Sequence, residues 1–259
     1  MNRTTEHSAV QRREMILNQI RENESVSVHE LAELFCVSDM TIRRDLHILE
    51  EQRLVDVHYG GATLRNIHPE IQNFSVRQNK LDQYKLAIAR TAAGYIQNGD
   101  ILFLDTSTTI LCMFRFLPDV DVTIVTNSLP VMVETYANPH IHLIIAPGTY
   151  QEQYGGPLDY STAEYVSQFH YTKAFFGASA VDAAFGASAT RESESSVKRC
   201  VYANADHTYL LADHTKFGRK NLMKYNDVRD YEQIFTDPEL DDIQKSATLQ
   251  AGGHIVLCT

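Results

Sequence analysis

Hydrophobic residues recur at helical spacing in the first part of the chain. Residues 9 to 22 place Val10, Ile16, Leu17 and Ile20 on one face among Arg and Glu side chains. An apolar stripe of this kind on an otherwise polar segment is typical of a short amphipathic helix that packs one face against a core. The segment therefore predicts the first helix of a small helical domain.

The next segment carries a helix-start signal. Ser27 can cap a helix, and Glu30 stands three residues further on as the reciprocal partner of a capping box. We expect a second helix here, with Leu31, Leu34 and Phe35 as its buried set.

Ser38 repeats the start signal and predicts a third helix, joined to the second by three or four residues in the manner of a helix-turn-helix. Ile42, Leu46 and Leu49 fall within about 60° of each other around its axis. Four other residues point away from that apolar side: Met40, Arg43, Arg44 and His47. Arginines on the outer face suit a recognition helix, because Arg can donate paired hydrogen bonds to guanine in the major groove. An ordinary solvated face is the alternative.

A small hairpin or wing is predicted after the third helix. Residues 53 to 64 surround a glycine pair with β-branched and aromatic residues. Arg53, His58 and Tyr59 are the side chains able to reach the DNA backbone or the minor groove, and Arg65 follows them. The alternative is a flap that only stabilises the helices.

After a polar stretch around residues 65 to 80, short apolar runs alternate with helical segments. Alternation on this scale predicts an α/β fold with a buried parallel sheet and right-handed crossovers. We expect two domains, spanning 1–66 and 75–259, and a helix from Tyr84 to Ile96. The apolar runs are Ile101 to Leu104, Val122 to Val125, His142 to Ala146, Ala174 to Phe176, Thr208 to Ala212, Gln233 to Phe235 and Ile255 to Leu257.

Polar segments follow five of these runs. They are Asp105 to Thr109, Thr126 to Ser128, Pro147 to Thr149, Gly177 to Ser179 and Asp213 to Lys216. Ligands of open parallel sheets sit at the carboxyl ends of the strands, so these segments predict a site for a phosphorylated polyol. The Ser and Thr hydroxyls and Lys216 would bind the phosphate. Asp105, Asn127 and Asp213 would bind the hydroxyl groups of the sugar. The alternative is that these residues merely cap helices.

Charge and composition narrow the partners. The chain has 259 residues and a formal net charge of −10, which by itself ranks nucleic acid low. The first 66 residues hold 8 arginines, no lysine and 11 acidic residues, so any basic footprint is local. With few cationic contacts, non-specific DNA binding should be weak and sensitive to salt.

Composition also bears on location and metal binding. No apolar run approaches the roughly 18 residues of a membrane span, and the N-terminus has no apolar core of the signal-peptide type, so we expect a cytoplasmic protein. The four cysteines form no C-x-x-C pair, and no H-E-x-x-H motif occurs. No metal and no cofactor is predicted. The charged segment from Arg191 to Glu194 is interpreted as a solvated helix start.

The stretch from Arg12 to Ala62 closely resembles the N-terminal winged helix-turn-helix of the DeoR family of bacterial transcriptional regulators. TIRRDL, from Thr41 to Leu46, and HYGGA, from His58 to Ala62, carry the resemblance. It implies that five residues lie at the DNA: Ser38, Met40, Thr41, Arg43 and Arg44.

The remainder of the chain looks like the DeoR-family effector domain, which is similar in fold to ribose-5-phosphate isomerase and senses phosphorylated sugars or related metabolites. Lys85 with Ile88-Ala89, and the segments after the strands, carry this resemblance. It implies that phosphate or sugar oxygens are held by Asp105, Thr106, Ser107, Thr108 and Thr109. Further pocket residues by position are Asn127, Gly148, Glu192, Lys198, Asp213 and Lys216. The sequence departs from the family in having Ser107 where Gly is usual, and Pro147 in place of one glycine of a pair.

These observations predict a sequence-specific DNA-binding regulator, a repressor of a carbohydrate-metabolism operon controlled by a phosphorylated sugar, and not an enzyme. A homo-oligomer is expected, because one winged helix has a small footprint and paired half-sites raise specificity. The alternative is an isomerase-like sugar-phosphate enzyme carrying a DNA-binding module, with Asp105, Asp182 or Glu192 as its carboxylate base. A third interpretation makes the helix-turn-helix a protein-docking module.

Overall fold

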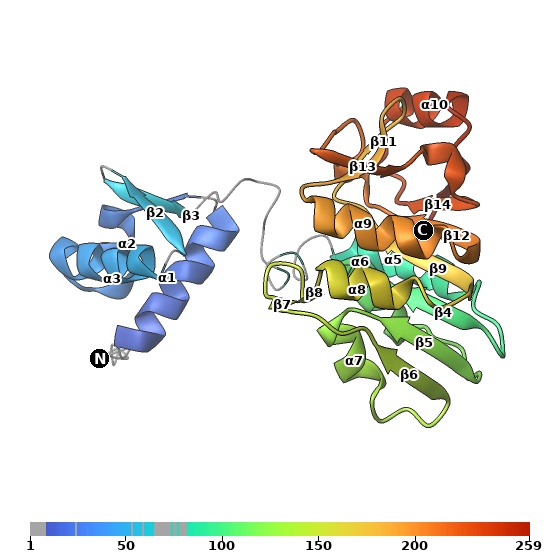
Figure 1. Cartoon of the computed structure of the whole chain (residues 1–259). Helices are drawn as coiled ribbons and strands as arrows, with labels where there is room; N and C mark the ends of the chain where they lie inside the picture. Colours follow the sequence, from blue (N-terminus) through green and yellow to red (C-terminus); the bar gives the residue numbers. More distant parts are fainter. Residues whose placement is uncertain are drawn as a thin grey trace. The chain divides into compact units, whose positions relative to one another are not determined.

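The computed structural model describes residues 9–23, 25–52, 54–58, 60–64, 74, 77 and 82–259. The chain divides into two compact units, Met1–Ile71 and Gln72–Thr259 (Figure 1). Each unit has a hydrophobic core of its own. None of the described helices is both long and apolar enough to cross a bilayer.

The first unit is a helix-turn-helix with a small antiparallel sheet. Within its described residues, the sheet has three strands in the order β1-β3-β2. The hairpin of β2 and β3 is the predicted wing, and it turns at Gly60, whose φ of 93° is left-handed. The elements are α1 (Ala9–Asn23), β1 (Ser25–Ser27), α2 (Val28–Phe35), α3 (Asp39–Glu51), β2 (Val55–His58) and β3 (Gly61–Leu64).

Local capping signals fix where α2 and α3 begin. Ser27 and Glu30 form the predicted capping box at the start of α2, with the Glu30 N–H donating to Ser27 Oγ at 3.2 Å. Ser38 Oγ accepts from the Thr41 N–H at 3.3 Å at the start of α3. Cys36, with a φ of 52°, ends α2 in the left-handed conformation and turns the chain toward α3. The predicted helix starts are confirmed.

The core of the first unit is built from one face of each helix. Leu34 was expected in it but is 59% exposed, because it lies about 120° around α2 from buried Val28. Phe35 is half-buried and packs against the core. The most buried apolar side chains of the helices are Ile16, Ile20, Val28, Leu31, Ile42, Leu46 and Leu49.

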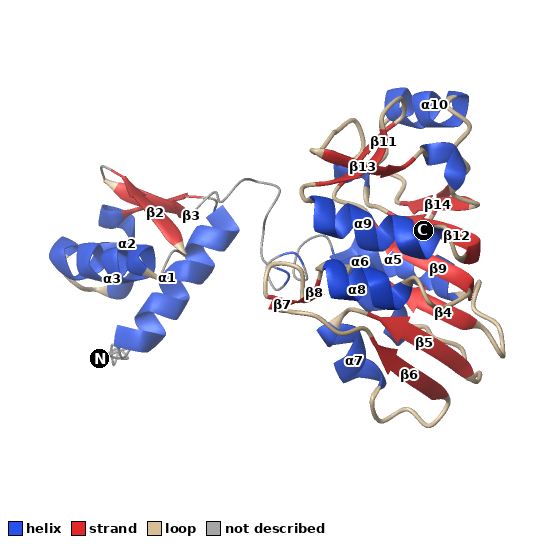
Figure 2. Cartoon of the chain, viewed as in Figure 1, coloured by secondary structure: helices blue, strands red, loops and turns tan. Residues whose placement is uncertain are grey.

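The second unit is a parallel sheet with helices on both faces (Figure 2). Among the described residues the sheet has seven strands in the order β15-β14-β12-β9-β4-β5-β6, and every neighbouring pair is parallel. Its strands are β4 (Ile101–Leu104), β5 (Val122–Thr126), β6 (Ile141–Ile145), β9 (Tyr171–Gly177), β12 (Ala205–Leu211), β14 (Gln233–Thr236) and β15 (Ile255–Leu257). All seven apolar runs are therefore confirmed as strands of one sheet, and the predicted α/β class is confirmed.

The helices of this unit lie between the strands in sequence. The predicted helix from Tyr84 begins slightly earlier and ends at Ala93. The helices are α5 (Asp82–Ala93), α6 (Thr108–Leu111), η1 (Cys112–Arg115), α7 (Leu129–Thr135), α8 (Tyr160–Val166), α9 (Glu192–Tyr202), η2 (His214–Lys216), η3 (Val228–Asp230) and α10 (Asp242–Gln250). Five further short strands form outside the main sheet in the described part of this unit: the pair β7 (Tyr150–Gln151) and β8 (Gly156–Pro157), and the set β10 (Ala180–Asp182), β11 (Gly186–Ala189) and β13 (Met223–Asn226).

Two apolar cores sandwich the main sheet, because side chains alternate between its faces. On β4, Phe103 belongs to one core while Leu102 and Leu104 belong to the other. Val197 of α9 packs in the first core and Ile88 of α5 in the second. This layering leaves the carboxyl ends of β4, β5 and β9 side by side at one edge of the sheet.

Candidate functional site

The exposed face of α3 gathers the side chains predicted to meet DNA. Met40 is 74% exposed, and Arg43, Arg44 and His47 are exposed beside it. His47 has Glu50 as a near neighbour, with 3.2 Å between its Nδ1 and the carboxylate. The opposite side of α3 is buried in the core, so the helix can present this face only outward.

The wing contributes one described side chain to the predicted set. His58, on β2, is exposed, whereas Arg53 and Tyr59 lie outside the described residues, as does Arg65. The backbone N–H of Val57 donates to Glu50 Oε1 at 3.3 Å, which ties the wing to α3.

A buried polar cluster occupies the carboxyl edge of the main sheet in the second unit. Asp105, directly after β4, is 0% exposed and accepts a hydrogen bond from Lys198 of α9. The Gly177 N–H donates to the same carboxylate oxygen at 3.0 Å, and Lys198 Nζ donates to the Gly177 carbonyl at 2.9 Å. Three elements that are distant in sequence therefore meet at one ion pair.

Two more charged groups join this cluster. Glu194, one turn before Lys198 on α9, is 6% exposed, and its Oε1 lies 3.7 Å from Lys198 Nζ. Burial raises the pKa of Glu194, and the neighbouring Lys198 only partly offsets that effect. Burial lowers the pKa of Arg77, which the charges of Glu194 and Asp105 oppose. The cluster thus sets the Lys198 ammonium against two buried carboxyl groups. Arg77, which is half-buried and donates to the Gln153 carbonyl at 3.0 Å, acts on them through its charge.

Three buried oxygens of this edge have no hydrogen-bond partner among the described residues. They are Asp105 Oδ1, Asn127 Oδ1 and Glu194 Oε2. Asn127 follows β5, and its Nδ2 donates to the Pro157 carbonyl at 2.9 Å. An unmet buried acceptor costs about 1–3 kcal/mol, so a ligand that brings hydroxyl or N–H donors would be stabilised here.

The threonine and serine segment after β4 is buried as a whole. Thr106, Thr108 and Thr109 are each at most 8% exposed. Ser107 is occupied as the cap of α6, its Oγ accepting from the Thr109 N–H at 3.2 Å. A Cβ added at Gly177 would lie 2.4 Å from the Ser107 Cβ, so Ser107 leaves room at position 177 only for glycine.

The other predicted ligand residues are more dispersed. Glu192 is exposed on the first turn of α9, so the interpretation of a solvated helix start holds there but is wrong for Glu194. Asp213 is buried and caps η2, accepting from the Thr215 N–H at 3.0 Å, and Lys216 is half-buried. Gly148 has a φ of 139° and is exposed.

Sequence reasoning missed Arg77 in this cluster and did not pair Asp105 with Lys198. Arg77 falls in the polar stretch between the two expected domains, where no periodic pattern marks it. Asp105 and Lys198 are 93 residues apart, and only the folded sheet brings them together. Glu194 and Lys198 are four residues apart, so helical spacing does relate them.

Comparison with known proteins assigns both units. Residues 12–67 match the DeoR-like helix-turn-helix domain, and residues 81–238 match the DeoR C terminal sensor domain. The chain belongs to the DeoR family. The resemblance predicted from TIRRDL and from the later segments is confirmed, and the protein is a DeoR-family transcriptional regulator.

Curated relatives of this DeoR-family regulator match it over nearly their whole length. The HTH-type transcriptional regulator YulB of Bacillus subtilis is 32% identical, over 89% of this chain and 90% of the relative. The glycerol-3-phosphate regulon repressor of Escherichia coli is also 32% identical, over 88% and 90%. The transcriptional repressor GlcR of Bacillus subtilis is 30% identical, over 86% of each chain.

The structural likeness is weaker. Ribose 5-phosphate isomerase A of Methanocaldococcus jannaschii matches 52% of this chain and 54% of its own, with 17% identity and a TM-score of 0.39. A likeness at this level says nothing about activity.

Proposed function

We propose that this DeoR-family regulator is a repressor that binds operator DNA through α3 and the wing and is controlled by a phosphorylated sugar bound in the second unit. DNA binding is assigned to the predicted domain 1–66, and ligand binding to the predicted domain 75–259. The observation that carries the proposal is the combination of an outward-facing arginine pair on α3 with a buried, partly unmet polar cluster at the sheet edge.

On the DNA side, α3 would enter the major groove. Arg43 and Arg44 would contact bases or phosphates, and Ser38 and Thr41 at the helix start would meet phosphate oxygens. The remaining proposed contacts are Met40, His47, Arg53, His58 and Tyr59. Binding as a homo-oligomer would add the geometry of paired half-sites to these few contacts.

On the ligand side, the unmet oxygens of Asp105, Asn127 and Glu194 would accept hydrogen bonds from sugar hydroxyls. The segment from Thr106 to Thr109, with Lys216, would hold the phosphate. The remaining proposed contacts are Gly148, Glu192, Lys198 and Asp213. A relative named for the glycerol-3-phosphate regulon supports a phosphorylated polyol as the ligand class.

The placement of the carboxylates supports a regulator without isomerase activity. Asp105 is engaged by Lys198 and by the Gly177 N–H, and Asp182 accepts from the Phe185 N–H at 2.7 Å. Glu192 is exposed. In an isomerase, one of these carboxylates would have to reach a carbon-bound proton of the ligand rather than its hydroxyls. Assaying the full chain for aldose–ketose isomerisation of the bound sugar phosphate tests this point, and turnover would overturn it.

Selection of duplexes from a random library by the full-length protein tests the DNA role. Enriched sequences are expected, and Arg43→Ala and Arg44→Ala should each weaken binding to them by about 5- to 150-fold, the equivalent of 1–3 kcal/mol for a base contact. Arg115→Ala, which removes an exposed arginine of the second unit, is the matched control and should bind as the parent does. Unchanged binding by the Arg43 and Arg44 variants would favour the protein-docking interpretation.

Thermal denaturation with a panel of sugar phosphates tests the ligand role. A ligand at 100 times its Kd should add about 2.7 kcal/mol to stability. To relieve repression, the ligand must also bind the non-operator conformation more tightly, by about 5.5 kcal/mol for a complete switch. The proposed pocket is refuted if none of the sugars in the panel, phosphorylated or unphosphorylated, raises the melting temperature.

A further inference from the structure

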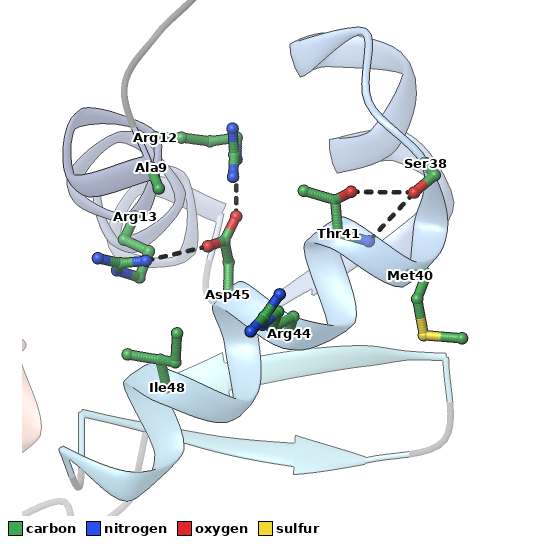
Figure 3. Close-up of a pocket in the computed structure, with 9 residues that line it drawn as sticks. All are labelled: Ala9, Arg12, Arg13, Ser38, Met40, Thr41, Arg44, Asp45 and Ile48. Carbon is green, nitrogen blue, oxygen red and sulfur yellow. Dashed lines mark hydrogen bonds and ion pairs between the residues drawn. The ribbon is translucent and has the colours of Figure 1, made fainter.

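A groove lies between α1 and α3 in the first unit, with a volume of about 420 Å³ (Figure 3). We call it the arginine groove. The polar residues that line it are Arg12, Arg13, Ser38, Thr41, Arg44 and Asp45. The groove runs along α3, beside the face of this helix that is proposed to contact DNA. No residue of α1 is among the DNA contacts proposed above.

Asp45 holds two arginines of α1 in the groove. Its side chain is 4% exposed, its Oδ2 lies 2.6 Å from Arg12 Nε, and its Oδ1 lies 3.2 Å from Arg13 Nη1. Figure 3 shows the carboxylate between the two guanidinium groups, with each oxygen turned to one of them. A single buried carboxylate therefore positions both arginines against α3.

The ion pairs leave the groove strongly cationic. Arg12, Arg13 and Arg44 bring three guanidinium groups against the one carboxylate among the lining residues. Each guanidinium carries five N–H donors, and the pairs with Asp45 use one nitrogen of Arg12 and one of Arg13. The side chains of Arg12 and Arg13 keep 13% and 20% of their surface exposed, so a ligand can reach them.

Hydroxyl groups complete the lining at the start of α3. Ser38 Oγ and Thr41 Oγ1 lie 2.9 Å apart, and Figure 3 shows both across the groove from Arg12 and Arg13. Guanidinium and hydroxyl donors around one space match the three-dimensional array of oxygens on a phosphate. The position beside the outward face of α3 matches the sugar–phosphate backbone that borders a major groove.

We infer that the arginine groove binds one backbone phosphate of duplex DNA, with Arg12 and Arg13 donating to its oxygens and Asp45 acting as their positioning residue. The inference rests on the proposed DNA-binding function and adds α1 to the contact surface. Because a phosphate contact carries no sequence information, it contributes to binding of any duplex and anchors α3 in register.

Salt titration with a 30-base-pair duplex of mixed sequence tests the inference, using the full chain. For each lost phosphate contact, the slope of log Kobs against log[KCl] should fall in magnitude by about 0.9. Arg12→Gln combined with Arg13→Gln removes both donors to the one phosphate and is expected to show this fall. Arg115→Gln removes a positive charge from the second unit, at a residue that does not line the groove, and should leave the slope unchanged.

Lysine variants show whether the two arginines of α1 contact phosphate or only stabilise the fold. Arg12→Lys combined with Arg13→Lys loses the guanidinium contacts with Asp45 but keeps both charges, so the parent slope should be retained. A slope equal to the parent in the double glutamine variant, or an equal loss in the double lysine variant, would overturn the inference. Circular dichroism melting of each variant reports the folding of the first unit. If binding needs Arg43 and Arg44 but the groove variants keep the parent slope, this inference alone fails; if binding needs neither set, the proposed DNA-binding function fails.

Discussion

Replacing Lys198 with Met removes a cation that contacts two buried carboxyl groups while keeping a side chain of similar length. Asp105 is 0% exposed and would keep the Gly177 N–H at 3.0 Å but lose its charged partner. Glu194, 3.7 Å from the ammonium, would lose its partner on α9 as well. Removing one member of a buried ion pair costs about 3–5 kcal/mol, because the remaining charge stays desolvated.

The expected loss is large enough to measure by differential scanning calorimetry. For a unit the size of Gln72–Thr259, 1 kcal/mol corresponds to about 2–4 °C, so Lys198→Met should lower the transition of this unit by about 6–20 °C. Lys220→Met is the matched control. Lys220 is 57% exposed and 3.5 Å from Asp182, and an exposed pair of this kind contributes about 0–1 kcal/mol.

A second substitution shows whether the loss comes from the unpaired charge. Adding Asp105→Asn to Lys198→Met removes both charges and keeps an oxygen that can accept from the Gly177 N–H. The double variant should therefore recover at least half of the lost stability. A Lys198→Met protein that melts within about 2 °C of the parent, the shift of a surface pair, would refute the buried ion pair as a stabilising contact. A double variant as unstable as the sum of the single variants would refute the coupling.

Three further substitutions test separate parts of the structure. Burial raises the pKa of Glu194, so this carboxyl releases its proton at a higher pH in the folded protein than in the unfolded chain, and stability should fall as pH rises above the ordinary glutamate range. Glu194→Gln should lack this fall when urea unfolding is measured against pH, whereas exposed Glu192→Gln should retain it. Gly177→Ala should lower the calorimetric stability of the second unit by about 1–3 kcal/mol, because the new Cβ meets the Ser107 side chain, and Ser107→Gly should relieve the clash. Ser38→Ala should lower the stability of the first unit in chemical denaturation by about 0.5–2 kcal/mol through loss of the α3 cap; no change would mean that the cap is dispensable.

The parts of the fold predicted correctly are those that local chemistry determines. Ser27 and Ser38 mark helix starts because a cap needs only the next three residues. The strands of the main sheet are continuous apolar runs because both faces of the sheet are covered. Strands β7, β8, β10, β11 and β13 were not predicted, since two to four residues with glycine, proline or polar side chains carry no measurable period. Leu34 was placed wrongly because an apolar residue type does not fix its angle around a short helix.

The candidate ligand site is less predictable for a different reason. Its individual residues lie at strand ends, where sequence reasoning looks for them, but the contacts between them span the whole unit. Asp105 and Lys198 meet across 93 residues, and the solvated or buried state of Glu194 depends on how α9 packs over the sheet. A charge-rich helix start predicts exposure by its composition alone. Whether one acidic residue at that helix start is buried depends on tertiary packing, which no local sequence pattern shows.

In the first unit, the positions of the charged side chains matter more for DNA binding than their net charge. Its first 66 residues hold more acids than arginines, yet Asp45 is turned inward to Arg12 and Arg13, while Arg43 and Arg44 face outward. Acidic groups away from the contact surface repel DNA, and salt screens that repulsion over about 8 Å at physiological ionic strength. Added salt therefore weakens the arginine contacts and the repulsion together, and the measured salt slope must be smaller than the number of phosphate contacts implies. For this reason, only differences in slope between matched variants count the contacts of a net acidic DNA-binding protein.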